Sequence, residues 1–420
     1  MDRRDFLRNS LLGAGGLVLA TSGLSSCVGG SKNIKVDKKT GMTLRRLGRT
    51  GLMVSEIGLG GEWLERCSAE ECRDVIRTCE EKGVNMLDIW MSEPNVRTNI
   101  GNALKGSREK WFIQGHLGST WQDGQYLRTR DLEKVDAAFE DLLTRLQTKY
   151  IDLGMIHYVD DLEEWETISK GEFYQYVLKL KKKGKIRHIG LGTHSVKVAQ
   201  AVAESGLVEM IMFSLNPAYD MLPSDVSIWG EDFSKASNGI NPERAHLYQT
   251  CEANDVGITV MKSYAGGRLF DPQLSPFGVA LTPVQCLHYA LTRPAVGSVM
   301  VGCANVEQVL AAVAYETAGD AEKDYATVLA NAPVHAYGGQ CTYCGHCKPC
   351  TAGIDIAMVN KLTDLADMHR DAIPSSVLDH YKVLQLHASD CTQCGNCEKR
   401  CPFGVGVIEK MKKAKELFGY

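Results

Sequence analysis

The sequence lacks both a charge imbalance and a long hydrophobic run, and each absence excludes a class of protein. Its 47 Lys and Arg residues nearly balance 51 Asp and Glu residues, which leaves a formal net charge of -4. Without a basic excess, no nucleic-acid footprint and no broadly basic membrane-binding surface are visible. No apolar run reaches the roughly 20 residues that a spanning helix needs, which excludes an internal membrane protein. The residue type that stands out is cysteine, with 15 in 420 residues.

Length and composition favour a folded chain with one large unit and a smaller one. Hydrophobic residues make up 44% of the sequence against 23% charged residues, which permits a packed core and argues against disorder. A length of 420 residues is too great for one ordinary domain and short for three.

The first thirty residues have the pattern of a targeting segment. Arg3, Arg4 and Arg8 precede an apolar stretch, and small residues then lead to Cys27. Residues 3–7 resemble the twin-arginine export motif, and residues 24–27 resemble a lipobox that would lipidate Cys27. We therefore expect export by the twin-arginine machinery to the periplasm or cell envelope, with membrane contact only through such a lipid. The alternatives are a chance arginine pair in a general secretory signal and a plain cleavage site.

After a linker at residues 31–42, the chain alternates short apolar runs with stretches of helical period. Strand-helix units of this kind form parallel sheets, and eight in about 260 residues favour an α/β fold closed as a (β/α)8 TIM barrel over residues 43–325. An open doubly wound sheet is the alternative. The predicted strands are Ile57–Gly60, Asn85–Trp90, Trp111–Leu117, Ile151–Val159, Ile186–Thr193, Met210–Asn216, Gly257–Ser263 and Ser298–Cys303.

A barrel places its chemistry at the carboxyl ends of the strands. The polar residues that the predicted strands would bring to this mouth are Asp88, His116, His157, His194, Asn216 and Lys262.

Motifs along the whole barrel region resemble the aldo/keto reductase family. The matching segments are Leu44–Leu52, Val54–Gly60, Gly83–Asp88, Ile100–Gly106, Tyr150–His157 and Gly184–Gly190. The family reduces carbonyls with a nicotinamide cofactor through a tetrad of Asp, Tyr, Lys and His, in which Tyr is the proton donor. By this resemblance the tetrad Asp falls on Asp88 and the tetrad His on His157.

The other two tetrad positions differ, since Glu93 stands at the Tyr position and His116 at the Lys position. An ordinary glutamate is ionised at neutral pH, so the acid would be a Glu93 with raised pKa, His116 or His157. Alternatively, the reductase site is lost and the barrel is a non-catalytic docking body. A third interpretation is a two-histidine, one-carboxylate metal site of Glu93, His116 and His157, and the plainest is a hydrogen-bonded pocket wall.

The resemblance also implies a bound NADP or NAD. In the family, the last strand and the next helix bind the cofactor phosphate at a helix N-terminus, where unpaired N–H groups favour an anion. Lys262 takes the place of an aromatic residue that stacks on the nicotinamide, or is simply solvated, and residues 265–269 resemble the iron-sulfur branch of the family. The expected cofactor-binding residues are Thr193, Asn216, Lys262, Gly302, Asn305 and Gln308.

The C-terminal cysteines give the strongest chemical signal. Residues 391–402 have the bacterial ferredoxin spacing CxxCxxCxxxCP, and residues 341–350 have a similar run with one residue fewer before the last cysteine. We predict two 4Fe-4S clusters in a small helical ferredoxin-type domain at residues 326–420, with helices near 357–369 and 375–386 packing it on the barrel. By the two-cluster rule, one cluster takes Cys341, Cys344, Cys347 and Cys401, and the other takes Cys391, Cys394, Cys397 and Cys350. The alternative is two four-cysteine zinc sites.

Together these features predict an exported iron-sulfur oxidoreductase of the aldo/keto reductase type. Its clusters would carry electrons between a redox partner of unknown identity and a small carbonyl or alcohol substrate, or a bound nicotinamide, at the barrel mouth. The docking-body and metal-enzyme interpretations remain the alternatives.

Overall fold

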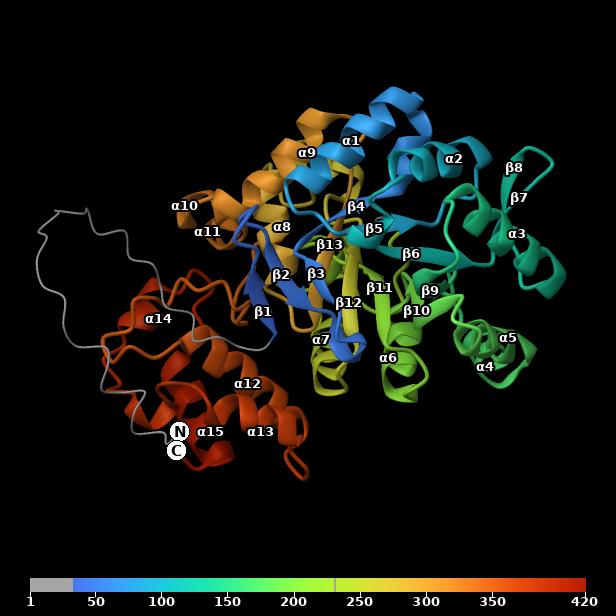
Figure 1. Ribbon diagram of the computed structural model, residues 1–420. Coiled ribbons are helices and arrows are strands. Elements are labelled where there is room, and N and C mark those ends of the chain that lie inside the picture. The colour runs from blue at the N-terminus through green and yellow to red at the C-terminus, as the bar shows by residue number, and fades with distance from the viewer. Residues whose placement is uncertain (1–32, 230–231) are drawn as a thin grey trace, which may run out of the picture. The chain divides into compact units, whose positions relative to one another are not determined.

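The computed structural model describes residues 33–229 and 232–420 (Figure 1). The targeting segment predicted at residues 1–30 lies outside the described residues. In the part of the chain that is described, no helix combines the length and the apolar character needed to cross a membrane.

Within the described chain, eight parallel strands close into a barrel (Figure 1). The last strand pairs with the first, with Met300 opposite Gly58, so the sheet has no open edge. The predicted (β/α)8 barrel is confirmed, and closure excludes the open doubly wound sheet. The strands are β4 (Ile57–Gly60), β5 (Met86–Ile89), β6 (Phe112–Leu117), β9 (Ile151–Ile156), β10 (Ile186–Thr193), β11 (Met210–Ser214), β12 (Gly257–Met261) and β13 (Val296–Gly302).

Amphipathic helices cover the outside of the barrel, as the sequence period predicts. In α3, Asp131 caps the N-terminus, and Val135, Phe139 and Leu142 form the buried face. The outer helices are α1 (Ala69–Glu81), α2 (Pro94–Ala103), α3 (Leu132–Arg145), α4 (Leu162–Lys170), α5 (Glu172–Lys182), α6 (Val196–Ser205), α7 (Pro242–Ala253), α8 (Pro283–Leu291) and α9 (Val306–Val313).

A small antiparallel sheet closes the end of the barrel where the strands begin. It consists of β1 (Ile34–Val36), β2 (Thr43–Arg46) and β3 (Met53–Ser55). Leu47, which follows β2, is fully buried against Gly257 and Gly297 at the starts of β12 and β13. The opposite end, where the strands finish, is therefore the end available for chemistry.

A hairpin that the sequence period did not predict stands at that open end. Strands β7 (Ser119–Gln122) and β8 (Gln125–Arg128) pair antiparallel between β6 and α3, with Trp121 opposite Tyr126. The hairpin projects beside the barrel in Figure 1. It adds side chains to the mouth that the strand ends alone do not supply.

The C-terminal module is helical and packs directly on the barrel. Helix α12 lies where a helix is predicted near 357–369 and contacts α7, and Lys361 forms an ion pair of 2.9 Å with Glu252 of that helix. The predicted domain boundary at residues 325–326 falls at the first residues of α11, and both α10 and α11 contact α8. The module helices are α10 (Asp320–Lys323), α11 (Tyr325–Ala330), α12 (Ile356–Met368), α13 (Ser375–Lys382), α14 (Asn396–Arg400) and α15 (Val407–Phe418).

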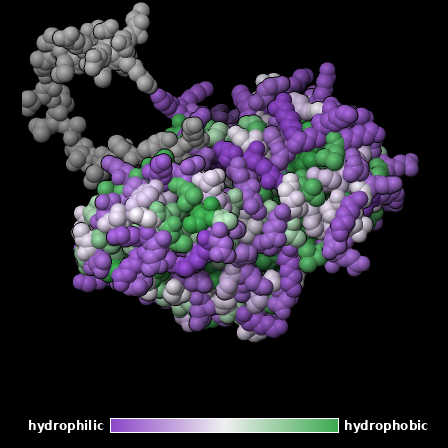
Figure 2. All heavy atoms as spheres, turned by 90° about the horizontal axis from the view of Figure 1, so that it is seen from below, coloured by the Kyte–Doolittle hydropathy of each residue, from purple (hydrophilic) through white to green (hydrophobic). Residues whose placement is uncertain are grey.

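Hydrophilic residues predominate on the face seen from below, and hydrophobic residues there form separate patches (Figure 2). Most large hydrophobic side chains are instead buried in a core that runs continuously from the barrel helices into the C-terminal module. The module therefore shares a packed core with the barrel.

Candidate functional site

Three of the polar residues predicted at the mouth are joined by hydrogen bonds. Asp88 lies in β5, His116 lies in β6, and His157 directly follows β9. His116 Nε2 is 2.9 Å from Asp88 Oδ1, and His116 Nδ1 is 2.8 Å from His157 Nδ1. All three side chains are buried, so these bonds are shielded from water.

The hairpin adds a fourth member to this line. The Tyr126 hydroxyl lies 2.7 Å from His157 Nε2, the remaining nitrogen of that ring. The indole of Trp90 stacks on His157 with a centroid separation of 5.9 Å, and its ring meets Tyr126 edge-on. We call Asp88, His116, His157 and Tyr126 the mouth relay. Sequence reasoning missed Tyr126, since only its phenol chemistry within an unassigned loop could have drawn attention to it.

When Asp88 is a carboxylate, every hydrogen bond of the relay is donated in the same direction, from Tyr126 toward Asp88. A carboxylate only accepts, so His116 donates from Nε2 and its Nδ1 becomes an acceptor for His157. The Nε2 of His157 then accepts the Tyr126 hydroxyl proton, while Gln114 donates to Asp88 at 2.8 Å. The hydrogen bonds thus form a continuous line from a phenol to a buried carboxylate.

The surroundings keep His157 and Tyr126 uncharged. Burial, with the neighbouring His116 and Arg130 next in importance, holds the pKa of His157 well below its usual value. Burial also raises the pKa of Tyr126, against the opposing effect of Arg128. A neutral phenol that donates to a neutral imidazole is the resting arrangement.

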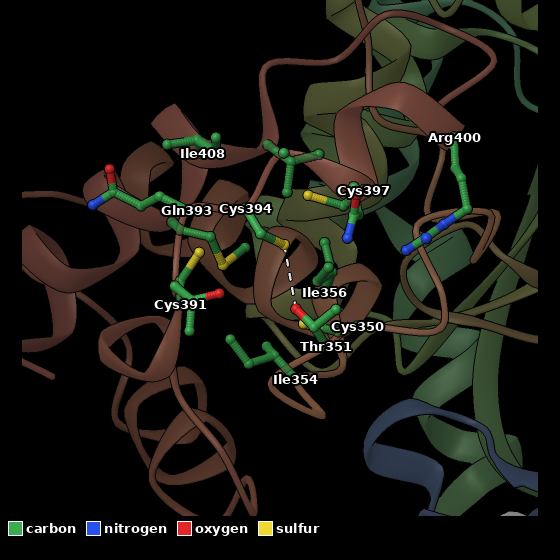
Figure 3. Close-up of a pocket in the computed structure, with 15 residues that line it drawn as sticks. Cys350, Thr351, Ile354, Ile356, Cys391, Gln393, Cys394, Cys397, Arg400 and Ile408 are labelled. Carbon is green, nitrogen blue, oxygen red and sulfur yellow. Dashed lines mark hydrogen bonds between the residues drawn. The ribbon is translucent and has the colours of Figure 1, made fainter.

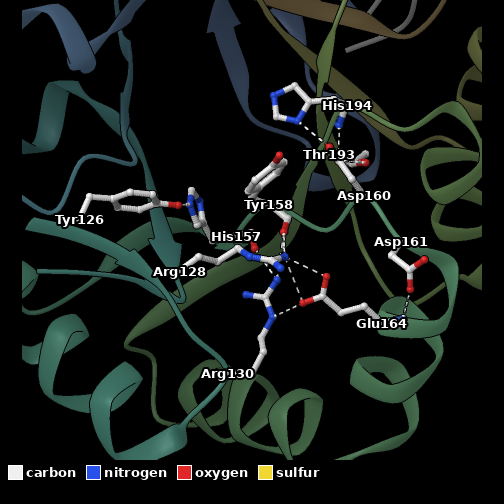
Figure 4. Close-up of polar contacts among 10 residues, drawn as sticks. All are labelled: Tyr126, Arg128, Arg130, His157, Tyr158, Asp160, Asp161, Glu164, Thr193 and His194. Atoms are coloured by element: carbon white, nitrogen blue, oxygen red, sulfur yellow. Dashed lines mark hydrogen bonds and ion pairs between the residues drawn. The ribbon is translucent and has the colours of Figure 1, made fainter. Parts of the chain in front are cut away.

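Two arginines hold the hairpin and the segment after β9 in place (Figure 4). Arg130 donates to the backbone oxygen of His157 at 2.6 Å, and Arg128 donates to that of Tyr158 at 2.7 Å. Both arginines also pair with Glu164 of α4, at 3.1 and 2.9 Å. These contacts hold the hairpin that carries Tyr126 against the backbone at His157. They therefore keep the Tyr126 hydroxyl within hydrogen-bond distance of the His157 ring.

Glu93 does not join the histidines. It is the N-cap of α2, where one carboxylate oxygen accepts the Val96 N–H at 2.6 Å and the other accepts from Asn95 at 2.9 Å. A carboxylate held at a helix N-terminus is an ordinary structural arrangement. The structure therefore separates Glu93 from the acid role and from the metal site predicted with His116 and His157, whose ring nitrogens are all hydrogen-bonded.

The residues predicted to bind the nicotinamide end of the cofactor contact other residues of the protein in this structure. Thr193 donates to Asp160 at 3.0 Å, and Asn216 donates to the Lys262 backbone oxygen at 2.9 Å. The Lys262 ammonium lies 4.5 Å from the ring centroid of Trp229, and burial lowers its pKa. These side chains therefore order the loops that follow β10, β11 and β12.

The predicted phosphate cradle is also filled by the chain's own groups. Asn305 caps α9 by accepting the Gln308 N–H at 3.0 Å, and Gln308 accepts the Ala304 N–H at 2.7 Å. The ring of Trp63 covers Gly302, where a Cβ would lie 2.2 Å from its Cδ1 atom. In this arrangement Trp63 and Gln308 occupy the edge of the predicted cradle, and the bound nicotinamide stays a prediction.

One hollow gathers cysteines from both C-terminal runs. Its wall includes Cys341, Cys344 and Cys347 of the first run together with Cys401 of the second. Asn360 donates to the Cys341 sulfur at 3.4 Å, and the Val405 N–H donates to the Cys401 sulfur at 3.5 Å. We call this the first hollow.

A second hollow gathers the other four cysteines, Cys350, Cys391, Cys394 and Cys397 (Figure 3). Cys394 is exposed to solvent, and its sulfur lies 3.2 Å from the Thr351 hydroxyl. Gly395 has φ of +72° and open space where a Cβ would lie, so its glycine serves the backbone turn. The two hollows divide the eight cysteines as the two-cluster rule predicts, and a set of four thiols around each hollow fits a 4Fe-4S cluster.

The other described cysteines lie apart from both hollows. Cys67 is partly exposed, and the rest are buried in the core, where burial raises the pKa of thiols such as Cys72 to about 12. These thiols are small core residues. The buried set is Cys72, Cys79, Cys251, Cys286 and Cys303.

Comparison with known proteins agrees with this geometry. Residues 56–280 match the aldo/keto reductase family, and residues 313–405 match the 4Fe-4S dicluster domain. The oxidoreductase YqkF of Bacillus subtilis, itself uncharacterized, is 27% identical over 286 residues, which cover 64% of this chain and 89% of YqkF. The aldo-keto reductase YhdN of the same organism is 27% identical over 157 residues, 35% of this chain and 46% of YhdN.

The barrel also has the fold of a solved relative. The holo form of aldo-keto reductase AKR11C1 from Bacillus halodurans aligns with a TM-score of 0.53 and 22% identity, covering 67% of this chain and 94% of that one. The family match extends over more than half of the chain, with the mouth relay at the carboxyl ends of the barrel strands. The chain is therefore an oxidoreductase that belongs to the aldo/keto reductase family, and it carries a 4Fe-4S dicluster domain.

Proposed function

We propose that the protein couples electron transfer through two 4Fe-4S clusters to the interconversion of a small carbonyl and its alcohol at the barrel mouth. The observation that carries this proposal is the mouth relay, which restores a phenol donor where the tetrad tyrosine is missing. Two clusters, when bound, would carry one electron each, and reduction of a carbonyl to its alcohol takes two electrons.

The residues of the mouth handle the proton at oxygen. During reduction Tyr126 donates its proton to the substrate oxygen, and the second proton, at carbon, comes from water. Before this transfer the relay takes up one proton from water, which leaves a positively charged ring at His116 beside the Asp88 carboxylate, 2.9 Å away, and the same proton returns to Tyr126 afterwards. His157 then donates from Nε2 to the phenol, so the tyrosinate left after proton transfer is stabilised by a hydrogen bond. In alcohol oxidation the same groups act in reverse.

The first experiment measures reaction between the clusters and a panel of simple aldehydes, ketones and alcohols. Anaerobically purified protein whose clusters are reduced is mixed with each carbonyl. Protein whose clusters are oxidised is mixed with each alcohol, and the cluster absorbance is followed in both cases. Tyr126→Phe should slow the reaction by roughly 100-fold or more, which is the low end of a general-acid contribution. Tyr158→Phe, a neighbouring tyrosine outside the relay, should react at nearly the unaltered rate.

The docking-body alternative makes the opposite prediction. No carbonyl or alcohol would then change the cluster absorbance, and Asp88→Ala and His157→Ala would leave electron exchange with a protein partner unaltered. Nicotinamide binding is tested separately by titrating NADPH and NADH onto the protein and measuring fluorescence. Tight binding of either nucleotide would show that Trp63 moves away from Gly302 and that Gln308 moves away from Ala304.

We also propose that the protein acts after export to the periplasm or cell envelope. The support is the order of Arg3, Arg4 and the apolar stretch before Cys27, together with a cofactor-bearing domain that must be assembled before export. Replacing both arginines by lysine should retain the full-length precursor inside the cell, as measured by fractionation and immunoblot. Unaltered export of that variant would contradict the twin-arginine route, and Cys27→Ser tests lipid attachment.

A further inference from the structure

Arg293 is a buried cation that the mouth chemistry does not use. It follows α8 and is 2% exposed. Each of its hydrogen bonds goes to a neutral oxygen: the Thr342 backbone oxygen, the Tyr325 hydroxyl at 3.2 Å and the Thr292 hydroxyl at 3.0 Å. Its Nε and Nη1 atoms are buried without any hydrogen-bond partner. A guanidinium buried in this way needs a counter-charge, because desolvation of an unpaired ion is costly.

The nearby carboxylates already have partners. Asp220 is bonded to the hydroxyls of Tyr248 and Tyr289, at 2.5 and 2.7 Å, and lies 3.7 Å from Arg244. Asp364 accepts from Tyr343 and pairs with Lys410. The Arg293 guanidinium itself lies over aromatic rings, 4.6 Å from the centroid of Tyr289 and 5.9 Å from that of Tyr343.

Arg293 touches the first cysteine run. Thr342, whose backbone oxygen it binds, stands between Cys341 and Tyr343, and Arg293 lines the same cavity as Cys341. A 4Fe-4S cluster with four thiolate ligands carries net negative charge, which increases by one on reduction. A positive charge buried beside it therefore stabilises the reduced form more than the oxidised form.

We propose that Arg293, a residue of the barrel, is the counter-charge of the cluster in the first hollow and raises its reduction potential above that of the second cluster. This inference rests on the proposed function, since it requires both clusters. The second hollow has an arginine at its wall too, but Arg400 is exposed and its charge is screened by water. Electrons that enter the second cluster near the exposed Cys394 would then pass to the first-hollow cluster, which has the higher reduction potential.

The test measures the two reduction potentials by electron paramagnetic resonance during a redox titration. Cys401→Ser and Cys350→Ser, each lacking one ligand of one hollow, assign the two signals in otherwise unaltered protein. The first-hollow cluster should be reduced at the higher potential. The reverse order would overturn the proposal, even if every Arg293 variant failed to fold.

Arg293 variants then test the residue itself. Arg293→Gln should shift the first-hollow cluster at least tenfold toward its oxidised form at a fixed potential, which is ~59 mV for one electron. Arg293→Lys, which keeps the charge, should recover most of the shift, and Arg400→Gln should change either potential much less. Equal potentials in Arg293→Gln and unaltered protein would overturn the inference. Fewer than about eight irons in unaltered protein would instead contradict the proposed function.

Discussion

At the residue scale, Tyr126 takes the position beside His157 that the sequence motif suggested for Glu93. The carboxylate at the tetrad position caps α2, and a phenol from a hairpin approaches the imidazole instead. A capping carboxylate accepts from backbone N–H groups that would otherwise be unpaired, whereas a phenol near a neutral imidazole can give and regain a proton.

Glu93→Ala should therefore affect stability and leave the chemistry unaltered. Loss of the cap should lower the free energy of unfolding by about 1 kcal/mol, measured by urea denaturation, and cluster oxidation by a carbonyl should proceed at its original rate. Glu93→Asp, which keeps a capping carboxylate, is the control. A large loss of reaction rate with unaltered stability would return Glu93 to the catalytic group.

His288 should make the barrel less stable in mild acid. Burial, followed by Lys323 and Arg45, lowers its pKa to about 3, and its ring accepts or donates at 3.0 Å to Tyr315. The unfolded chain binds this proton near pH 6.5 and the folded chain does not, so stability is full above that pH and decreases as the pH falls toward 3. Between pH 7 and pH 5 the loss should be about 1 to 2 kcal/mol.

The measurement compares urea unfolding of unaltered protein and His288→Gln across that range. The variant lacks the titrating ring, so its pH dependence should be smaller by that amount. An equal slope in both proteins would mean that other groups account for the acid sensitivity.

At the scale of elements, the β7–β8 hairpin and α4 act together. Arg128 and Arg130 extend from the hairpin and its following residues to Glu164 of α4, and both also hold the backbone after β9. Because these ion pairs are only partly exposed, they order the hairpin more than a surface pair would.

Glu164→Gln should increase hydrogen exchange in the hairpin several-fold, up to roughly tenfold for a loss of ~1.4 kcal/mol. Mass-spectrometric exchange over residues 119–128 measures this. Glu166→Gln is the matched control on the same helix, because Glu166 pairs with Lys170 in solvent, with side-chain exposures of 67% and 75%. An equal effect of both variants would show that the arginine contacts do not order the hairpin.

At the scale of the whole molecule, the two cysteine runs exchange their fourth cysteines between the hollows. Each cluster would thereby connect segments separated by some fifty residues, so that metal binding and folding of the module are coupled. The barrel contributes through α7 and α8, against which the module packs.

Cys401→Ser should remove the cluster of the first hollow, although this residue belongs to the second run. Iron content should fall from about eight to about four atoms per chain, and one paramagnetic signal should remain. Cys67→Ser, a change at a partly exposed cysteine outside both hollows, should keep the full iron content. Loss of the other signal would show that each run binds its own cluster.

The alternation of apolar runs with stretches of helical period predicted strand-helix units from sequence alone, because a buried parallel strand is apolar along its length and an amphipathic helix repeats every 3.6 residues. Their number favoured a barrel over an open sheet, and only the pairing of β13 with β4 decided its closure. Cysteine spacing likewise determined the cluster motif, since a short loop must bring its sulfur atoms around one group. Both are local properties of the chain.

The tertiary structure decided which groups meet at the mouth and beside the cysteine hollows. Tyr126 reaches His157 through a hairpin whose direction is set by Arg128 and Arg130, and Arg293 reaches Thr342 only where α8 packs on the module. Glu93 likewise turned to its own helix because α2 begins there and needs a cap. Such partners lie tens of residues apart, so they depend on how the elements pack and have no pattern along the chain.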